Sequence, residues 1–73
     1  MNENYEKLAN AIVLQAVKDY RLALKRLAKH PRNKEALYTK KEVEGFFRSG
    51  FYETLTTVDG GMLIEKLNEE VKA

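Results

Sequence analysis

Few residues of this 73-residue chain could perform acid–base or nucleophilic chemistry. The chain contains one histidine, His30, and no cysteine. A catalytic base needs a nucleophile within reach and a third group that orients it, whereas His30 precedes Pro31 among cations at the end of a helical pattern. We interpret His30 as a group that caps a helix end, and we expect a protein without enzymatic activity.

Metal and phosphate sites are the next candidates, and the sequence favours neither. Without cysteine, the remaining metal ligands are carboxylates such as Glu65, Glu69 and Glu70. Two glutamates four residues apart, as in Glu65 and Glu69, are typical of a solvated helix face. The Asp-Gly-Gly segment at 59–61 lacks the lysine and the preceding strand of a phosphate-binding loop, and a helix N-cap explains it. We therefore expect no bound metal and no cofactor.

Basic residues are concentrated in the middle of the chain, although the net charge is only +2. Residues 18–41 hold nine basic and two acidic residues, whereas residues 42–73 hold seven acidic and three basic residues. At 100° per residue, five cations fall within about 80° of one another on one helix, opposite its apolar residues. We name this row the basic ridge, and it consists of Lys7, Lys18, Arg21, Lys25 and Lys29.

We interpret the basic ridge as a surface that grips a phosphate backbone or an acidic protein face. A solvated helix face is the alternative, because lysine-rich outer faces are common and the isoelectric point is only 8.9. Leu14 projects from the middle of the ridge, and we predict that it takes part in a protein interaction. The predicted nucleic-acid contacts are Lys18, Arg21, Lys25, Arg26, Lys29, Arg32 and Lys34.

An aromatic cluster in the second half of the chain has two interpretations. Phe46, Phe47, Phe51 and Tyr52 surround Arg48, and nucleic-acid bases stack on aromatic side chains that arginine flanks. A small domain needs large side chains to close its core, so we predict core packing instead. A helix-turn-helix motif in this region is rejected, because its second helix would carry aromatic, acidic and aliphatic side chains that read no bases.

The spacing of apolar residues predicts a long first helix over 3–29. These residues recur at intervals of three and four, which places them on one helix face. Acidic residues in the first turn and basic residues in the last turn suit the helix dipole, and the residue before Pro31 leaves the helical region. The predicted core stripe comprises Tyr5, Ala9, Ile12, Ala16, Tyr20, Ala23 and Leu27, widened by Val13, Val17 and Leu24.

Three further helices complete an all-α fold, a small helical bundle with one long N-terminal helix. The second helix is expected to begin at a cap on Asn33 or His30 and to reach Arg48. We expect one continuous helix with a possible kink, because no glycine or proline separates its two halves. A capping box at 39–42 leaves a later start open. The predicted N-caps of the short third helix and of the final helix, which runs through Val71, are Ser49 and Asp59.

The composition fits a single domain, 1–73, in the cytoplasm. At 44% hydrophobic and 33% charged, the chain is too apolar for a disordered tail and too polar for a membrane protein. The polar, acidic N-terminus does not match a secretion signal, and we expect no membrane contact. A 27-residue rod is about 40 Å long, against about 30 Å for a compact domain of this size. The long helix therefore overhangs, bends or is covered by a second chain, and we expect a homodimer.

Two stretches of the chain form a pattern: LQAVKDYR at 14–21 with LK at 24–25, and FFRS at 46–49 leading into VDG at 58–60 and LIEKL at 63–67. They resemble a group of short uncharacterised proteins encoded in phages and integrative elements of Gram-positive bacteria. The resemblance implies an accessory protein of host takeover, replication or regulation in a bacterial host. With the basic ridge, it predicts a non-enzymatic protein that binds nucleic acid or a nucleoprotein. The alternatives are a small inhibitor or adaptor that docks on a host protein, and an oligomeric structural protein.

Overall fold

Four helices make up the computed structural model, which describes residues 3–72. In chain order they are α1 (Glu3–Lys29), α2 (Lys34–Phe47), α3 (Gly50–Leu55) and α4 (Gly60–Lys72). No strand occurs among these described residues. The predicted all-α fold is confirmed, including the long first helix and the short third one.

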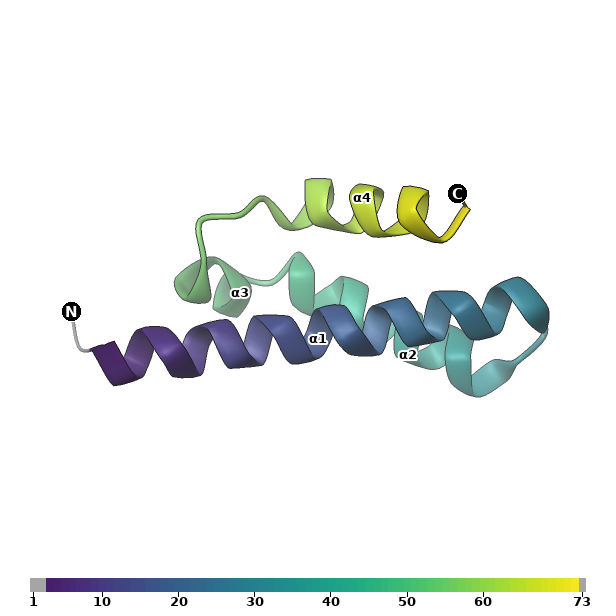
Figure 1. Cartoon of the computed structure of the whole chain (residues 1–73), viewed down its shortest axis with the longest axis horizontal. Helices are drawn as coiled ribbons and strands as arrows, with labels where there is room; N and C mark the ends of the chain where they lie inside the picture. Colours follow the sequence, from purple (N-terminus) through teal and green to yellow (C-terminus); the bar gives the residue numbers. More distant parts are fainter. Residues whose placement is uncertain (1–2, 73) are drawn as a thin grey trace.

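Helix α1 runs the whole length of the molecule (Figure 1), which measures 43 × 22 × 18 Å. Its first turns extend beyond α3 (Figure 1), so the long helix overhangs the bundle. It ends at Lys29, where the His30 N–H still donates to the Arg26 carbonyl oxygen at 2.7 Å. Pro31 follows, and its ring and missing N–H prevent a further turn.

The apolar stripe of α1 faces the other helices over most of its length. Tyr5 is an exception to the predicted stripe, because 47% of its surface is exposed, although it borders a hollow between α1 and the end of α3. The predicted stripe residues that are buried are Ala9, Val17, Tyr20, Ala23 and Leu24. Those that are partly buried are Ile12, Val13, Ala16 and Leu27.

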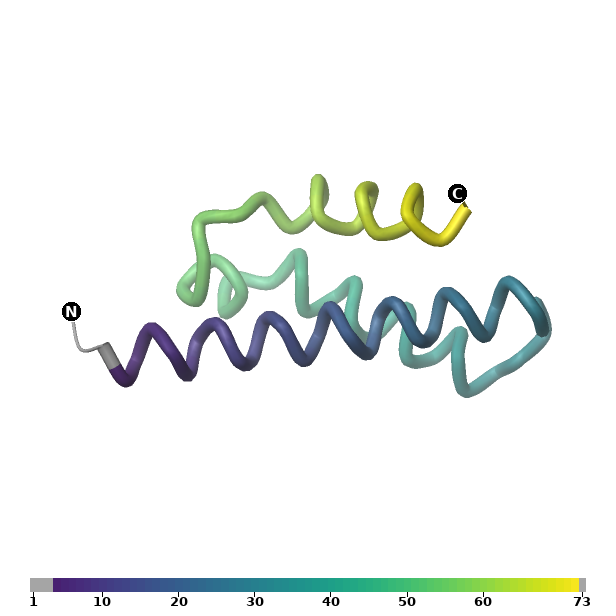
Figure 2. The backbone as a smooth tube through the Cα atoms, in the orientation of Figure 1, coloured from purple at the N-terminus to yellow at the C-terminus, as the bar shows by residue number. Residues whose placement is uncertain are grey.

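Helices α1 and α2 form an antiparallel hairpin, α3 lies beside the N-terminal half of α1, and α4 runs along the hairpin in the same direction as α1 (Figures 1 and 2). Every helix contributes to one core cluster, in which Tyr20 of α1 meets Phe47 of α2 and Tyr52 of α3, with Ile64 and Leu67 from α4. The Tyr20 and Phe47 rings meet edge to face with centroids 5.8 Å apart, as do those of Phe47 and Tyr52 at 5.6 Å. Such pairs add to the stabilisation that comes from burying their area.

The prediction that the aromatic cluster packs in the core is confirmed for three of its four members, of which two belong to the buried cluster and Phe46 packs against it. Phe47 and Tyr52 are buried, and Phe46 is partly buried. Phe51 is different, because 58% of its surface is exposed. Its ring still lies against that of Phe46, with centroids 6.1 Å apart. Phe51 therefore belongs to the edge of the cluster, and its assignment to the core was wrong.

Asn33 determines where α2 begins. Its side-chain oxygen accepts a hydrogen bond from the backbone N–H of Ala36 at 3.0 Å, which satisfies one of the free donors of the first turn. The helix then continues without a break to Phe47. Of the alternatives left open by the sequence, the His30 cap and the later start at Thr39 are both wrong.

Ser49 and Asp59 cap the two later helices as predicted. The Ser49 hydroxyl accepts from the Tyr52 N–H at 3.2 Å, and the Asp59 carboxylate accepts from the Met62 N–H at 2.9 Å. Gly60 lies so close to the end of α2 that an added Cβ would overlap the carbonyl oxygen of Phe47. Only glycine permits this approach, which brings the start of α4 onto the core.

Candidate nucleic-acid interface

The basic ridge lies on the face of α1 opposite its buried stripe. Lys7, Lys18, Lys25 and Lys29 are all exposed. They share one uninterrupted helix, so their spacing is rigid, and the distance along the axis from Lys18 to Lys29 is about 16 Å. The helix thus presents a row of positive charge to one side of the molecule.

Arg21 differs from the other ridge residues because it has an acidic partner. Its Nε lies 2.9 Å from a carboxylate oxygen of Glu70 on α4, and the two side chains are 46% and 51% exposed. The C-terminal half of the chain therefore neutralises one of the predicted phosphate contacts. An exposed pair of this kind contributes at most about 1 kcal/mol, so a phosphate group can compete for the arginine.

Three predicted contacts lie outside the ridge. Arg26 lines a hollow between α1 and α2 together with Asp19 and Ala36, about 100° around the helix from its ridge neighbour. It therefore lies at the side of the ridge that faces α2, about 60° around the helix from Lys29. Arg32 lies in the turn after α1 and Lys34 begins α2, and both are exposed. These two continue the positive charge beyond the end of the ridge.

Unpaired charge is the main electrostatic property of this surface. Among residues 3–72, Arg21 alone of the seven predicted contacts forms an ion pair. Leu14 stands within the ridge with 65% of its surface exposed, as its position on the helix predicts. The ridge thus combines free cations with one apolar side chain. The predicted contacts that form no ion pair among residues 3–72 are Lys18, Lys25 and Lys29 on the ridge, and Arg26, Arg32 and Lys34 outside it.

A second polar cluster lies inside the bundle, where Tyr20, Glu44, Lys40 and Asn68 join three helices. The Tyr20 hydroxyl donates to a Glu44 carboxylate oxygen at 2.6 Å, and the Lys40 ammonium donates to the same oxygen at 2.7 Å. The Asn68 side-chain amide donates to the Tyr20 hydroxyl at 3.0 Å. We name these four residues the Tyr20 network. Sequence reasoning missed it, although Lys40 and Glu44 stand at the four-residue spacing of a helical ion pair.

Burial and hydrogen bonding change the ionisation of the Tyr20 network. Burial, followed by the hydrogen bond to Glu44, raises the pKa of Tyr20 to about 12. Burial opposes ionisation of Glu44, but the hydrogen bonds from Lys40 and Tyr20 outweigh this effect and lower the pKa of its carboxyl group. The network is therefore a charged carboxylate held by donors, which is a stabilising arrangement for a partly buried acid.

The sequence offered His30 and the acidic side chains as candidates for catalysis and metal binding. His30 is exposed, and its carbonyl oxygen accepts from the Asn33 N–H at 3.0 Å. Within 3–72, no hydrogen bond joins the His30 ring to a hydroxyl or a carboxylate, and no cluster of three or more acidic or histidine side chains suits a metal ion.

The Tyr52 hydroxyl is buried without a hydrogen-bond partner among the described residues. Burial raises the pKa of Tyr52, with a smaller contribution from Asp59.

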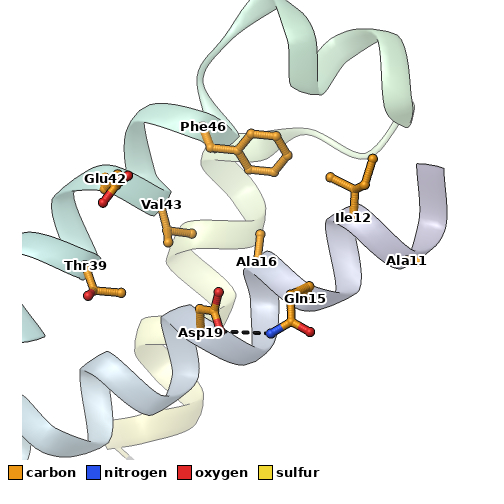
Figure 3. A pocket seen from close by; sticks show the side chains of 9 residues that line it. All are labelled: Ala11, Ile12, Gln15, Ala16, Asp19, Thr39, Glu42, Val43 and Phe46. Carbon is orange, nitrogen blue, oxygen red and sulfur yellow. Dashed lines mark hydrogen bonds between the residues drawn. The ribbon is translucent and has the colours of Figure 1, made fainter. Parts of the chain in front are cut away.

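An apolar groove lies between α1 and α2. Figure 3 shows Ile12 and Ala16 of α1 across from Val43 and Phe46 of α2, and the groove has a volume of about 650 Å³. Its rim is polar, and Gln15 there donates to a carboxylate oxygen of Asp19 at 3.0 Å (Figure 3). The sequence pattern did not reveal this groove, because its position depends on how α2 packs on α1. Its other lining residues are Ala11, Thr39 and Glu42.

Comparison with known proteins adds no family or neighbour. No protein-family profile, curated protein or solved structure is significantly similar to this chain. Within residues 3–72, no helix combines the length and the apolar character that crossing a bilayer requires. The fold and the surface therefore define the chain only by class, as an all-α protein that has four helices in residues 3–72 and, on the longest of them, a basic row in which Arg21 is ion-paired and Lys18, Lys25 and Lys29 are not.

Proposed function

We propose that this chain is a non-enzymatic accessory protein of a phage or mobile element, acting in the cytoplasm of a bacterial host, and that it binds nucleic acid through the basic ridge. The row of unpaired cations on α1 carries the proposal, because Lys18, Lys25 and Lys29 are exposed and form no ion pair among the described residues. Unpaired cations on a rigid rod displace the counterions of a phosphate backbone, and this release drives binding. Arg32 and Lys34 extend the contact beyond the helix.

Binding of this kind distinguishes nucleic-acid sequences only weakly. A lysine ammonium acts as a point charge, whereas base recognition depends on bidentate donors such as arginine, asparagine and glutamine. Arg21, the arginine of the ridge, is held by Glu70. The ridge therefore suits the phosphate backbone of a duplex or a nucleoprotein, with little base readout.

Salt dependence is the first test of the proposed function. For four phosphate contacts made by the ridge and its extension, we expect the affinity for a random-sequence duplex to fall about 100-fold between 50 and 200 mM salt. Fluorescence anisotropy with a labelled duplex measures this slope. An affinity that changes less than about twofold over this range rejects phosphate binding, because an apolar contact is insensitive to salt.

A charge-reversal variant is the second test, and the chain offers a matched control. Replacing Lys18, Arg21 and Lys25 by glutamate should abolish retention of the duplex, while far-ultraviolet circular dichroism remains unchanged because all three residues are exposed. The control replaces three exposed cations outside the predicted contacts by glutamate. It therefore changes the net charge by the same amount as the test variant, and it should retain most of the binding. The control cations are Lys41, Lys66 and Lys72. Equal losses in both variants would reject the ridge as the binding surface.

Leu14 favours one alternative, a protein-directed role in which the ridge docks on an acidic surface of a host protein. An exposed leucine among cations suits a mixed apolar and acidic partner better than a phosphate backbone. A tagged pull-down from host cells, with and without nuclease, separates the two functions. A specific protein that survives nuclease and is lost with Leu14→Gln supports the alternative, whereas nuclease-sensitive capture that Leu14→Gln leaves intact supports nucleic-acid binding.

A further inference from the structure

The molecule exposes more surface than a compact monomer of its mass. Its accessible surface is 5641 Å², whereas folded monomers of 8.4 kDa expose about 4,600 Å². Its radius of gyration is 13.1 Å, against about 11 Å for a compact domain of this length. The excess of about 1,000 Å² is close to the area of about 800 Å² that each partner contributes to a standard protein interface.

Two exposed leucines lie on the flank of α1 that borders the α1–α2 groove. Leu8 and Leu22 are 61% and 51% exposed, and Gln15 on the groove rim stands midway between them in the sequence. At 100° per residue, the three side chains fall within about 40° of one another on the helix. The leucines are two heptads apart, which is the repeat that keeps one face of a helix against a second helix.

We propose that a second copy of this chain packs antiparallel against α1, about a two-fold axis that passes beside Gln15. Leu8 then contacts the partner copy's Leu22, and Leu22 contacts the partner copy's Leu8. A two-fold interface requires this self-complementarity, because each contact must occur twice. Both copies of α1 and α2 form a four-helix arrangement, and its centre is apolar because the groove residues Ile12 and Phe46 lie there.

The composition of the groove favours a protein occupant over nucleic acid. Its floor is apolar, and its rim carries the carboxylates Asp19 and Glu42. A phosphate backbone would be repelled by these carboxylates and would gain nothing from the floor. The flank of a second α1 presents Leu8, Ala11 and Leu22 instead, with Gln15 and Arg26 beside them, and the apolar side chains lose their contact with water on association.

The pairing has a consequence for the basic ridge, and this consequence alone rests on the proposed function. The ridge lies about 80° around α1 from the Leu8–Leu22 flank, on the side away from α2. A two-fold axis perpendicular to both helices keeps both ridges on the same side of the dimer. The two rows of cations then form one basic face, with each α2 on the opposite side.

Sedimentation equilibrium of the full chain is the first measurement. The expected mass is twice 8.4 kDa, and Leu8→Glu or Leu22→Glu should each weaken association by at least about 30-fold. Both leucines are exposed in the single chain, so helicity and the midpoint of urea unfolding of the dissociated chain should be unaffected by the substitutions. Leu14→Glu is the matched control, because Leu14 lies outside the proposed interface, and it should stay dimeric. A monomeric wild type up to about 1 mM, or equal effects of all three substitutions, overturns the pairing.

Disulfide trapping tests the antiparallel geometry directly, because the natural chain has no cysteine. Gln15→Cys places two thiols beside the two-fold axis and should cross-link rapidly under mild oxidation. Leu8→Cys places them about 21 Å apart along the helix axis, far beyond the span of a disulfide, and should cross-link at least about tenfold more slowly. Faster cross-linking of Leu8→Cys overturns the geometry. Failure of nucleic-acid binding by an intact dimer rejects the proposed function alone, and binding by a monomeric wild type rejects the pairing alone.

Discussion

The Tyr20 network and the basic ridge differ in whether their charges have partners, although α1 contributes residues to both. In the network, the Glu44 carboxylate accepts hydrogen bonds from Tyr20 and Lys40, and only 16% of its side chain is exposed. On the ridge, Lys18 and Lys25 are exposed and have no acidic partner among the described residues. Charge inside the bundle is compensated, and charge on the ridge is left free.

This difference indicates which charges the fold needs. An ionised group that is partly removed from water destabilises the fold unless donors surround it, so the network must be complete for the helices to pack. Ridge cations keep their hydration and contribute almost nothing to folding. A surface that the fold does not require is free to serve binding, so substitutions in the two regions should affect different properties.

The largest expected effect is that of Tyr20→Ala. Tyr20 is fully buried, and removing a large aromatic side chain from a core costs about 3–5 kcal/mol. A domain of this size has a total stability of about 4–11 kcal/mol, so the variant should lose most of its stability. Urea unfolding monitored by circular dichroism measures the change. The matched control is Tyr38→Ala, because Tyr38 is exposed, and it should change the free energy of unfolding by less than about 0.5 kcal/mol.

Glu44→Gln should have the next largest effect, because it removes the charge that Lys40 and Tyr20 share. Loss of a charged acceptor that is partly buried costs about 1–3 kcal/mol in the free energy of unfolding. Chemical denaturation measures this cost, and nucleic-acid affinity should not fall. Glu53→Gln is the control, since Glu53 is exposed and forms no ion pair among residues 3–72. If both variants lose the same stability, the Tyr20 network does not hold the bundle together.

Acid should destabilise the protein through the same carboxylate. The pKa of Glu44 is lower in the folded chain than its ordinary value of 4.5, so folding favours the ionised form. The stabilisation is complete above pH 4.5 and is lost as the pH falls through the lowered pKa. Urea unfolding at a series of pH values below neutrality should therefore show a decline that is shallower in Glu44→Gln. Parallel declines in the two proteins would assign the acid sensitivity to other carboxylates.

The helices and their caps could be predicted from the sequence because they depend on neighbouring residues. Ser49 and Asp59 each cap a helix through an N–H three residues away, and the burial of Tyr20 follows from the period of the apolar stripe. The hydrogen bond between Tyr20 and Glu44 spans 24 residues, and that between Arg21 and Glu70 spans 49. Such pairs depend on how the helices pack, which no local pattern specifies.

The candidate site was predictable to the same extent. Helical spacing correctly predicted that the ridge lysines are exposed. The prediction succeeded because α1 is a regular helix whose apolar residues identify its buried face. The same spacing places Arg26 about 100° from Lys25, so its separation from the ridge was available from the sequence. The groove beside Ile12 could not be predicted from the sequence, because it exists only where α2 leaves that flank of α1 uncovered.

The smallest expected effect concerns Arg21, which belongs to the basic ridge but, unlike the ridge lysines, has an acidic partner. Glu70→Gln removes its partner and returns a free cation to the ridge. Because an exposed ion pair is worth about 0.2–1 kcal/mol, affinity for a duplex at low salt should rise between about 1.5-fold and fivefold, with little change in stability. Glu69→Gln makes the same change in net charge without freeing an arginine, so it should raise affinity less. Equal gains in the two variants would mean that duplex binding responds to net charge rather than to the ridge.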